Sequence, residues 1–269
     1  MSRRAYIGQA HGQVHYRQAG NAEGPALLLL HQAPSHSAMY DKLMRELEDD
    51  FYLLAPDLPG FGASDPLPRR SDDYGVSIAD LAEVVHVFLE GVAVERCFVF
   101  GHHTGAAVAA ALEQQYPGTA MRMAMSGPTL LTEEQRATLP ATAQLPGADA
   151  QGEYLLELWR KLRSKDEEAP LAISQRELMS ALAAGPAYRD AYQAVCEFDT
   201  AGALAAIACP TLVFAGDADP LYGAVEPALA ILPEGSRAEL EGGERTYVCE
   251  RQADRVAALL REFFKKSEA

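Results

Sequence analysis

Histidine is the residue type of this 269-residue chain that is best suited to acid–base chemistry, and it is unevenly distributed. The seven histidines are His11, His15, His31, His36, His86, His102 and His103. No histidine follows His103. A neutral imidazole, with an unperturbed pKa of about 6.5, can act as a base or a nucleophile near neutral pH. Any catalytic imidazole must therefore come from the first part of the chain.

The most informative motif is Gly101-His102-His103-Thr104-Gly105. It follows an apolar segment at 96–100, which predicts a buried strand, and precedes an alanine-rich segment at 104–116, which predicts a helix. Two glycines around a central residue in this context are typical of a sharp strand-to-helix turn that presents one side chain. Glycine is needed there because the backbone segments pass too closely for a Cβ atom. The presented side chain is that of His103.

The elements that must hold this turn alternate between strand and helix along most of the chain. Strands are predicted at 5–9, 13–18, 26–30, 51–55, 96–100, 120–125, 211–215 and 237–240. Helices are predicted at 37–48, 77–90, 104–116, 154–163, 171–184, 187–198, 225–232 and 252–264, with Ser37 and Ser77 as N-caps. This alternation predicts an α/β fold with a mostly parallel central sheet and helices on both faces.

Three predicted helices, at 154–163, 171–184 and 187–198, follow one another with no strand between them. We expect residues 130–204 to form a helical lid that is inserted into a core of residues 1–129 and 205–269. Ligands of such sheets bind beyond the carboxyl ends of the strands, so the lid would cover a ligand there. The polar segment 133–152, rich in Ala, Pro and Gly, is expected to be an exposed connection.

Three further segments resemble loops of the α/β-hydrolase superfamily. They are Leu-Leu-Leu-Leu-His-Gln-Ala-Pro at 27–34, Ala-Pro-Asp-Leu-Pro-Gly-Phe-Gly-Ala-Ser-Asp at 55–65, and Leu-Val-Phe-Ala-Gly-Asp-Ala-Asp-Pro at 212–220. With the turn at 101–105 they occur in the order of that superfamily, and the resemblance covers the whole chain. It implies an acid at Asp219, with Asp217 as the alternative, and an oxyanion hole made by the backbone N–H groups of Ala33 and Thr104.

The sequence departs from that superfamily at two of the three catalytic positions. The usual order is nucleophile, acid and histidine, but His103 occupies the nucleophile position. Arg245 stands where the histidine is expected, and Glu244 precedes it. Arginine stays protonated and cannot accept a proton at neutral pH. The usual relay of serine, histidine and acid is therefore absent, and Arg245 would most simply pair with Asp219.

Two functions of different kinds fit this site. The favoured one is a small-molecule enzyme of hydrolase type, in which His103 acts as base or nucleophile and is oriented by Asp219 or Glu244. It would act on an ester, thioester or lactone, or perform proton-transfer or lyase chemistry, with Gln32, His36 and Arg245 as substrate-binding residues. The alternative is an inactive hydrolase-like protein that binds a small apolar or aromatic ligand.

Composition limits the partners. The chain has 38 Asp and Glu against 23 Lys and Arg, a formal net charge of −15, which argues against nucleic acid or a membrane surface as partner. The four cysteines are scattered, and no apolar leader follows the N-terminus, so we expect a cytoplasmic protein. The sequence does not determine the oligomeric state, and a homodimer is compatible with it.

Two less favoured sites draw on the same histidines. A metal site could use His31, His36, His102 and His103, but the sequence has no HxH or HExxH spacing. A serine beside His36, at position 35 or 37, could form a nucleophile–base pair with it. We therefore expect neither a metal nor a cofactor.

Overall fold

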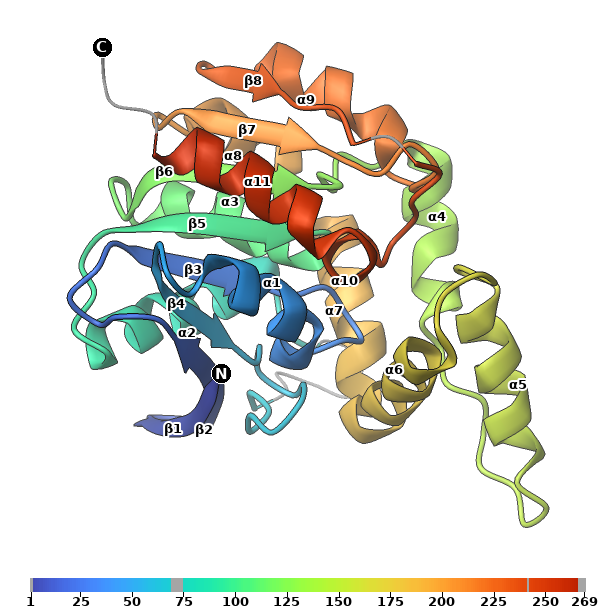
Figure 1. The fold of residues 1–269 in the computed structure, drawn as a ribbon. Helices are drawn as coiled ribbons and strands as arrows, with labels where there is room; N and C mark the ends of the chain where they lie inside the picture. The colour runs from blue at the N-terminus through green and yellow to red at the C-terminus, as the bar shows by residue number, and fades with distance from the viewer. Residues whose placement is uncertain (1, 69–74, 241, 266–269) are drawn as a thin grey trace.

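A central sheet of eight strands organises the molecule (Figure 1). The computed structural model describes residues 2–68, 75–240 and 242–265. The strand order across the sheet is β1-β2-β4-β3-β5-β6-β7-β8. In chain order the strands are β1 (Arg3–Gln9), β2 (Gly12–Ala19), β3 (Ala26–Leu30), β4 (Tyr52–Pro56), β5 (Cys97–His102), β6 (Ala120–Ser126), β7 (Thr211–Phe214) and β8 (Gly235–Arg237).

The sheet is parallel from β4 to β8, and β1 and β2 add an antiparallel edge. Strand β3 is buried along its whole length, which is why it reads as an unbroken apolar run. The predicted mostly parallel sheet is confirmed. The last strand was predicted at 237–240, but β8 ends at Arg237. Beyond it, an isolated bridge between Gly216 and Leu240 continues the pairing.

Helices cover both faces of the sheet, as the alternating pattern predicted (Figure 1). One apolar core lies under α2 (Ile78–Gly91) and α3 (Thr104–Gln115) and includes Leu28 and Leu30. The other lies under α1 (Asp41–Leu47) and α11 (Ala253–Phe264) and includes Leu27 and Leu29. The alternate side chains of β3 thus face opposite cores.

The helix starts follow local capping chemistry. Ser77 and Asp80 form the capping box of α2, which confirms the predicted N-cap. The prediction of a single helix from Ser37 was wrong in detail. A 3₁₀ turn, η1 (Ser37–Tyr40), precedes α1, and its cap is His36, whose side chain accepts a hydrogen bond from the Ala38 N–H.

Helices follow one another between β6 and β7. They are α4 (Glu133–Thr142), α5 (Glu153–Arg163), α6 (Leu171–Ala184), α7 (Pro186–Glu197) and α8 (Thr200–Ala206). The α4–α7 segment lies beyond the carboxyl ends of the strands (Figure 1). The expectation of a plain connection at 133–152 was wrong for its first half, because Thr132 and Gln135 form a capping box that starts α4.

The last of these helices, α8, packs instead against α3 and α9 (Val225–Ile231), beside the sheet. The boundary expected after residue 204 therefore falls inside α8. The two remaining short helices are η2 (Tyr222–Ala224) and α10 (Val248–Arg251). Within the described residues, no helix combines the length and apolar character that crossing a membrane requires.

Candidate active site

The turn between β5 and α3 has a constrained backbone. His103 lies between the end of β5 and the first residue of α3, with φ of 49° and ψ of −113°. Such a positive φ is uncommon for a residue with a side chain and marks a position that its surroundings enforce. A Cβ atom on Gly101 would lie 2.4 Å from the Gly105 carbonyl oxygen, and one on Gly105 would lie 1.9 Å from that of Leu30. The flanking glycines are therefore required, as the motif predicted.

His103 contacts Asp219 directly. The Nε2 atom of His103 lies 2.8 Å from Oδ2 of Asp219, a residue in the loop after β7. The other carboxylate oxygen accepts a hydrogen bond from the Leu221 N–H at 2.7 Å. The Asp219 side chain is buried, and that of His103 is 16% exposed. The expected ion pair of Asp219 with Arg245 was wrong, because the imidazole at the turn reaches the carboxylate itself.

The contact fixes the protonation pattern of the pair. Burial works to raise the pKa of Asp219, but His103, His102 and the Leu221 N–H favour the carboxylate, and the net effect lowers the pKa. An ionised Asp219 can only accept a hydrogen bond from Nε2, so in the neutral ring we assign the hydrogen to Nε2. The lone pair of Nδ1 is then available to accept a proton from another molecule.

Two backbone donors were predicted to line an oxyanion hole. Thr104 opens α3, and its N–H is among the first groups of the helix, which have no intrahelical acceptor. The Ala33 N–H has a partner, because it donates to Oγ1 of Thr104 at 3.3 Å. The hydroxyl of Thr104 thus engages one of the two N–H groups that were expected to stabilise an oxyanion, and both residues line one cavity.

His103 and Thr104 line a cavity of about 470 Å³. Its walls combine residues of the core, such as Ala33 and Leu221, with residues of the α4–α7 segment. The apolar lining includes Leu131, Leu139, Val195 and Leu221, and the polar lining includes Thr129, Lys161, Lys165 and Tyr192. This volume suits a small molecule, since ligand pockets measure roughly 300–1,000 Å³.

The three residues expected to bind substrate lie outside this lining. Gln32 is buried, and its side chain is bonded to Thr246, whose hydroxyl donates to Oε1 of Gln32 at 2.8 Å. His36 caps η1 and lies in a different cavity, with Nδ1 3.9 Å from Asp57. Arg245 is exposed and has no hydrogen bond or ion pair with a described residue. Substrate contacts by these residues stay a prediction without support from this arrangement.

The alternative acids have other partners. Asp217 accepts hydrogen bonds from the backbone N–H groups of Gly242 and Glu244, so it holds the loop before α10. Glu244 is buried, and its carboxylate lies 2.9 Å from the guanidinium of Arg251. Of the acidic residues weighed from the sequence, the structure brings only Asp219 to His103.

Two neighbouring histidines have structural partners. Nε2 of His31 accepts the Leu58 N–H at 2.8 Å, and its Nδ1 donates to the Gln32 carbonyl at 2.9 Å. Nε2 of His102 donates to the Thr246 carbonyl at 2.9 Å. Burial lowers the pKa of His31 to about 4 and that of His102 to about 3, so both rings are neutral near pH 7.

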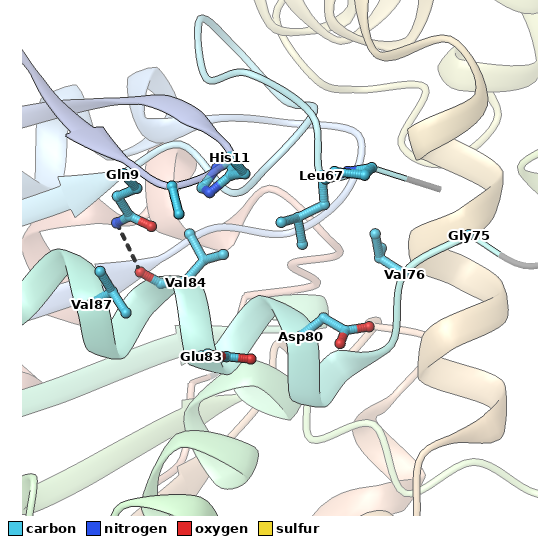
Figure 2. Close-up of a pocket in the computed structure, with 11 residues that line it drawn as sticks. Gln9, His11, Leu67, Gly75, Val76, Asp80, Glu83, Val84 and Val87 are labelled. Carbon is cyan, nitrogen blue, oxygen red and sulfur yellow. Dashed lines mark hydrogen bonds between the residues drawn. The ribbon is translucent and has the colours of Figure 1, made fainter. Parts of the chain in front are cut away.

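A second cavity, of about 240 Å³, lies elsewhere in the molecule, between the end of β1 and α2 (Figure 2). Gln9 closes one side of it by donating a hydrogen bond to the Val84 carbonyl at 3.1 Å. Its titratable lining is His11, Asp80 and Glu83, and Asp80 already belongs to the capping box of α2. No pair of base and acid like that of His103 and Asp219 is found among the described residues that line it.

The sequence analysis did not identify the polar residues that the α4–α7 segment and its flanks contribute to the cavity lined by His103 and Thr104. Lys161 lies in the last turn of α5, and Lys165 follows the end of that helix. Tyr192 and Thr129 also line the cavity, and they come from distant parts of the chain. Neither lysine belongs to a sequence pattern that would distinguish a cavity wall from a solvated surface.

Comparisons with known proteins agree with this arrangement of strands and loops. The family model described as serine aminopeptidase, S33, matches residues 23–227. The chain is 33% identical over 105 residues to an uncharacterized hydrolase of Saccharomyces cerevisiae, covering 39% of this chain and 35% of that protein. It is 29% identical over 119 residues to epoxide hydrolase 3 of Mus musculus, covering 44% and 32%. The matches thus span about a third of these relatives' length.

Solved structures resemble the whole chain. An esterase from Thermogutta terrifontis superposes with a TM-score of 0.77 at 21% identity, and the match covers 98% of both chains. A hydrolase from Pseudomonas aeruginosa superposes with a TM-score of 0.80 at 22% identity, again over 98% of both chains. Identities this low show a shared fold, and the chemistry must be argued from the site itself.

Proposed function

The chain belongs to the serine aminopeptidase family of α/β-hydrolases, and from this premise we propose that it hydrolyses a small-molecule carboxylic ester, thioester or lactone. The catalytic pair is His103 and Asp219, in place of the serine-centred triad. The proposal also includes a lid, residues 130–204, over a core of residues 1–129 and 205–269, because the α4–α7 segment contributes walls to the cavity that contains His103.

One observation carries this proposal: the 2.8 Å contact between His103 and Asp219 at the base of the cavity. A histidine oriented by a buried carboxylate is the arrangement by which hydrolases stabilise an imidazolium during proton transfer. A site that had kept only ligand binding would not need this pair. The glycines of the turn support the same conclusion, as does the Thr104 N–H, which has no hydrogen-bond partner among the described residues, because they preserve the geometry of an oxyanion site.

The arrangement favours His103 as a general base. Nε2 is engaged with Asp219, and Nδ1, the remaining nitrogen, is bonded to the ring carbon that carries the side chain. That position is more crowded than Nε2, so a water molecule reaches Nδ1 more easily than a substrate carbonyl carbon does. Nδ1 takes a proton from the water as the water oxygen bonds to the carbonyl carbon.

The tetrahedral oxyanion then receives hydrogen bonds from Thr104. Its backbone N–H opens α3, where the helix dipole also favours negative charge. Its hydroxyl accepts from the Ala33 N–H, so the hydroxyl hydrogen is free to point toward the cavity. When the bond to the leaving group breaks, the imidazolium returns its proton to the departing alkoxide, thiolate or lactone oxygen. Asp219 stabilises the imidazolium between the two transfers.

The test is hydrolysis of p-nitrophenyl esters, thioesters and lactones by the protein and by His103→Ala. We expect kcat/KM to fall roughly 100-fold or more in the variant, the typical contribution of a positioned base. His86→Ala is the control, because His86 lies on α2 and stacks on Tyr116, outside the cavity. Circular dichroism would verify that both variants are folded.

The outcome separates three possibilities. Activity that survives unchanged in His103→Ala would remove His103 from the mechanism. Labelling by a serine-directed fluorophosphonate would point instead to a serine such as Ser126, which is buried beside the turn. Tight binding of apolar esters without turnover would establish the alternative function, a ligand-binding protein on a hydrolase fold.

A further inference from the structure

We propose that the substrate carries a carboxylate close to its scissile carbonyl, and that the Lys165 ammonium binds this group inside the cavity. This inference rests on the proposed function and names its substrate class. It makes Lys165 a specificity-determining residue and Tyr188 and Tyr192 its positioning residues.

Two phenols hold the Lys165 ammonium. Its Nζ atom donates to the hydroxyl oxygens of Tyr188 and Tyr192, each at 3.2 Å. The same atom lies 5.6 Å and 5.7 Å from the centres of the two rings, which is within cation–π distance. Both tyrosines are on α7, and their rings meet edge to face with centroids 5.1 Å apart. The cation is therefore positioned by neutral groups and keeps its full charge.

No carboxylate compensates this charge within the described structure. The described lining of the cavity contains Lys161, Lys165 and His103 but neither Asp nor Glu. Among described residues, no acidic side chain lies within ion-pair distance of Lys165, although another partly buried cation of this segment, Arg176, is paired. This is unexpected in a chain whose acidic residues outnumber its basic ones by 38 to 23. A partly buried cation that lines a cavity without a counter-ion indicates that a ligand supplies one.

Lys161 adds to the positive potential. It lines the same cavity and donates to the Gln144 carbonyl at 3.0 Å. Burial lowers the pKa of Lys161, and the charge of Lys165 lowers it further. Burial also acts to lower the pKa of Lys165, but the phenols of Tyr188, Tyr192 and Tyr247 hold it above its usual value. The Lys165 ammonium therefore stays charged at neutral pH.

The contacts place this charge near the reacting group. The Tyr192 hydroxyl bonds Lys165 on one side and lies 3.5 Å from the Ala33 carbonyl oxygen on the other. The Lys165 ammonium is thus linked through Tyr192 to Ala33, in the loop that was expected to stabilise the oxyanion. Substrates with a few bonds between carboxylate and scissile carbonyl fit best.

The activity test compares a matched substrate pair, mono-p-nitrophenyl glutarate and the neutral p-nitrophenyl pentanoate. We expect Lys165→Gln to lower kcat/KM for the glutarate ester roughly tenfold or more, since it removes a charge-assisted hydrogen bond. For the neutral ester we expect a change of less than about twofold. Lys42→Gln makes the same charge change on the surface and should affect neither substrate. Equal loss on both substrates, or no loss on glutarate, would overturn the proposal.

A binding measurement separates this proposal from the proposed function. Calorimetric titration with 4-phenylbutyrate and with its amide needs no turnover, so it remains valid if the protein proves inactive. We expect the acid to bind the unmodified protein roughly tenfold more tightly than the amide, and Lys165→Gln to remove the difference. Equal affinity for the acid and the amide in the unmodified protein would refute the proposal, even if Lys165→Gln failed to fold.

Discussion

At the scale of single residues, the distinctive feature is the position of one imidazole. In the usual relay a histidine from the loop after the last strand bridges nucleophile and acid. Here His103, at the turn itself, contacts Asp219 at 2.8 Å, and Arg245 is exposed. The sequence predicted both members of the pair by position. It left open whether Asp219 or Glu244 orients His103, because the reach of a side chain depends on the turn geometry that the whole sheet imposes.

Gly127 should control how well His103 is positioned. A Cβ atom at Gly127 would lie 2.4 Å from Cδ2 and 2.6 Å from Nε2 of His103. We expect Gly127→Ala to displace the ring from Asp219 and lower kcat roughly tenfold or more, since misplacement of about 1 Å can cost 100-fold.

The matched control is Gly118→Ala. Gly118 has φ of 88°, comparable with 63° at Gly127, but a Cβ there meets nothing within 4 Å. Both variants should lose about 1–2 kcal/mol of stability through backbone strain, as thermal unfolding would show. A similar kcat in the two variants would mean that the Gly127 contact does not position His103.

At the scale of elements, loops after neighbouring strands assemble the site. Parallel strands end at one edge of the sheet, so the loops after β3, β5 and β7 bring Ala33, His103 and Asp219 together. The strand pattern predicted that these loops lie at one edge of the sheet. The sequence analysis did not predict the start of α4, because a capping box beside a proline-containing polar segment is a weak signal. The sequence predicted that the helices between β6 and β7 would cover a ligand, but it did not predict which of their side chains line the cavity, since that depends on tertiary packing.

Asp57 joins several of these elements and should make stability depend on pH. It accepts hydrogen bonds from His15 Nδ1 at 2.8 Å, the Ser37 N–H at 2.8 Å and the Ala63 N–H at 2.9 Å. Burial works to raise the pKa of Asp57, but the hydrogen bonds from His15, Ser37 and Ala63 bring it well below its usual range, and His31 adds to this effect only at acid pH, where its ring becomes protonated. Its stabilisation is therefore present above about pH 4 and is lost as pH falls through the folded pKa.

We expect Asp57→Asn to lower the free energy of unfolding by about 3 kcal/mol near pH 7. The difference from the unmodified protein should shrink as the pH falls below about 4, as urea unfolding at several pH values would reveal. Asp41→Asn is the control, because Asp41 is partly exposed and its pair with Arg17 is worth at most about 1 kcal/mol. A difference that is independent of pH would contradict the role assigned to the Asp57 carboxylate.

At the scale of the whole molecule, an acidic protein surrounds a locally positive cavity. The formal net charge is −15, while the described cavity lining includes two lysines and no carboxylate. Composition gives the sign of the net charge, and this sign argues against polyanionic partners such as nucleic acid. It could not predict the local sign, because cancellation depends on which side chains folding brings together. Membership of the family explains the fold, whereas the chemistry depends on the residues of the site itself.

The measurement that tests the central claim most directly is the rate of ester hydrolysis by His103→Ala as imidazole is added. We expect imidazole to restore hydrolysis in a saturable way, because it can occupy the space of the missing ring and bond Asp219. The rate with imidazole but no protein is subtracted, and the double variant His103→Ala with Asp219→Asn should show no rescue. Full activity in His103→Ala before imidazole is added, or no rescue at any concentration, would contradict the assignment of His103 and Asp219 as the catalytic pair.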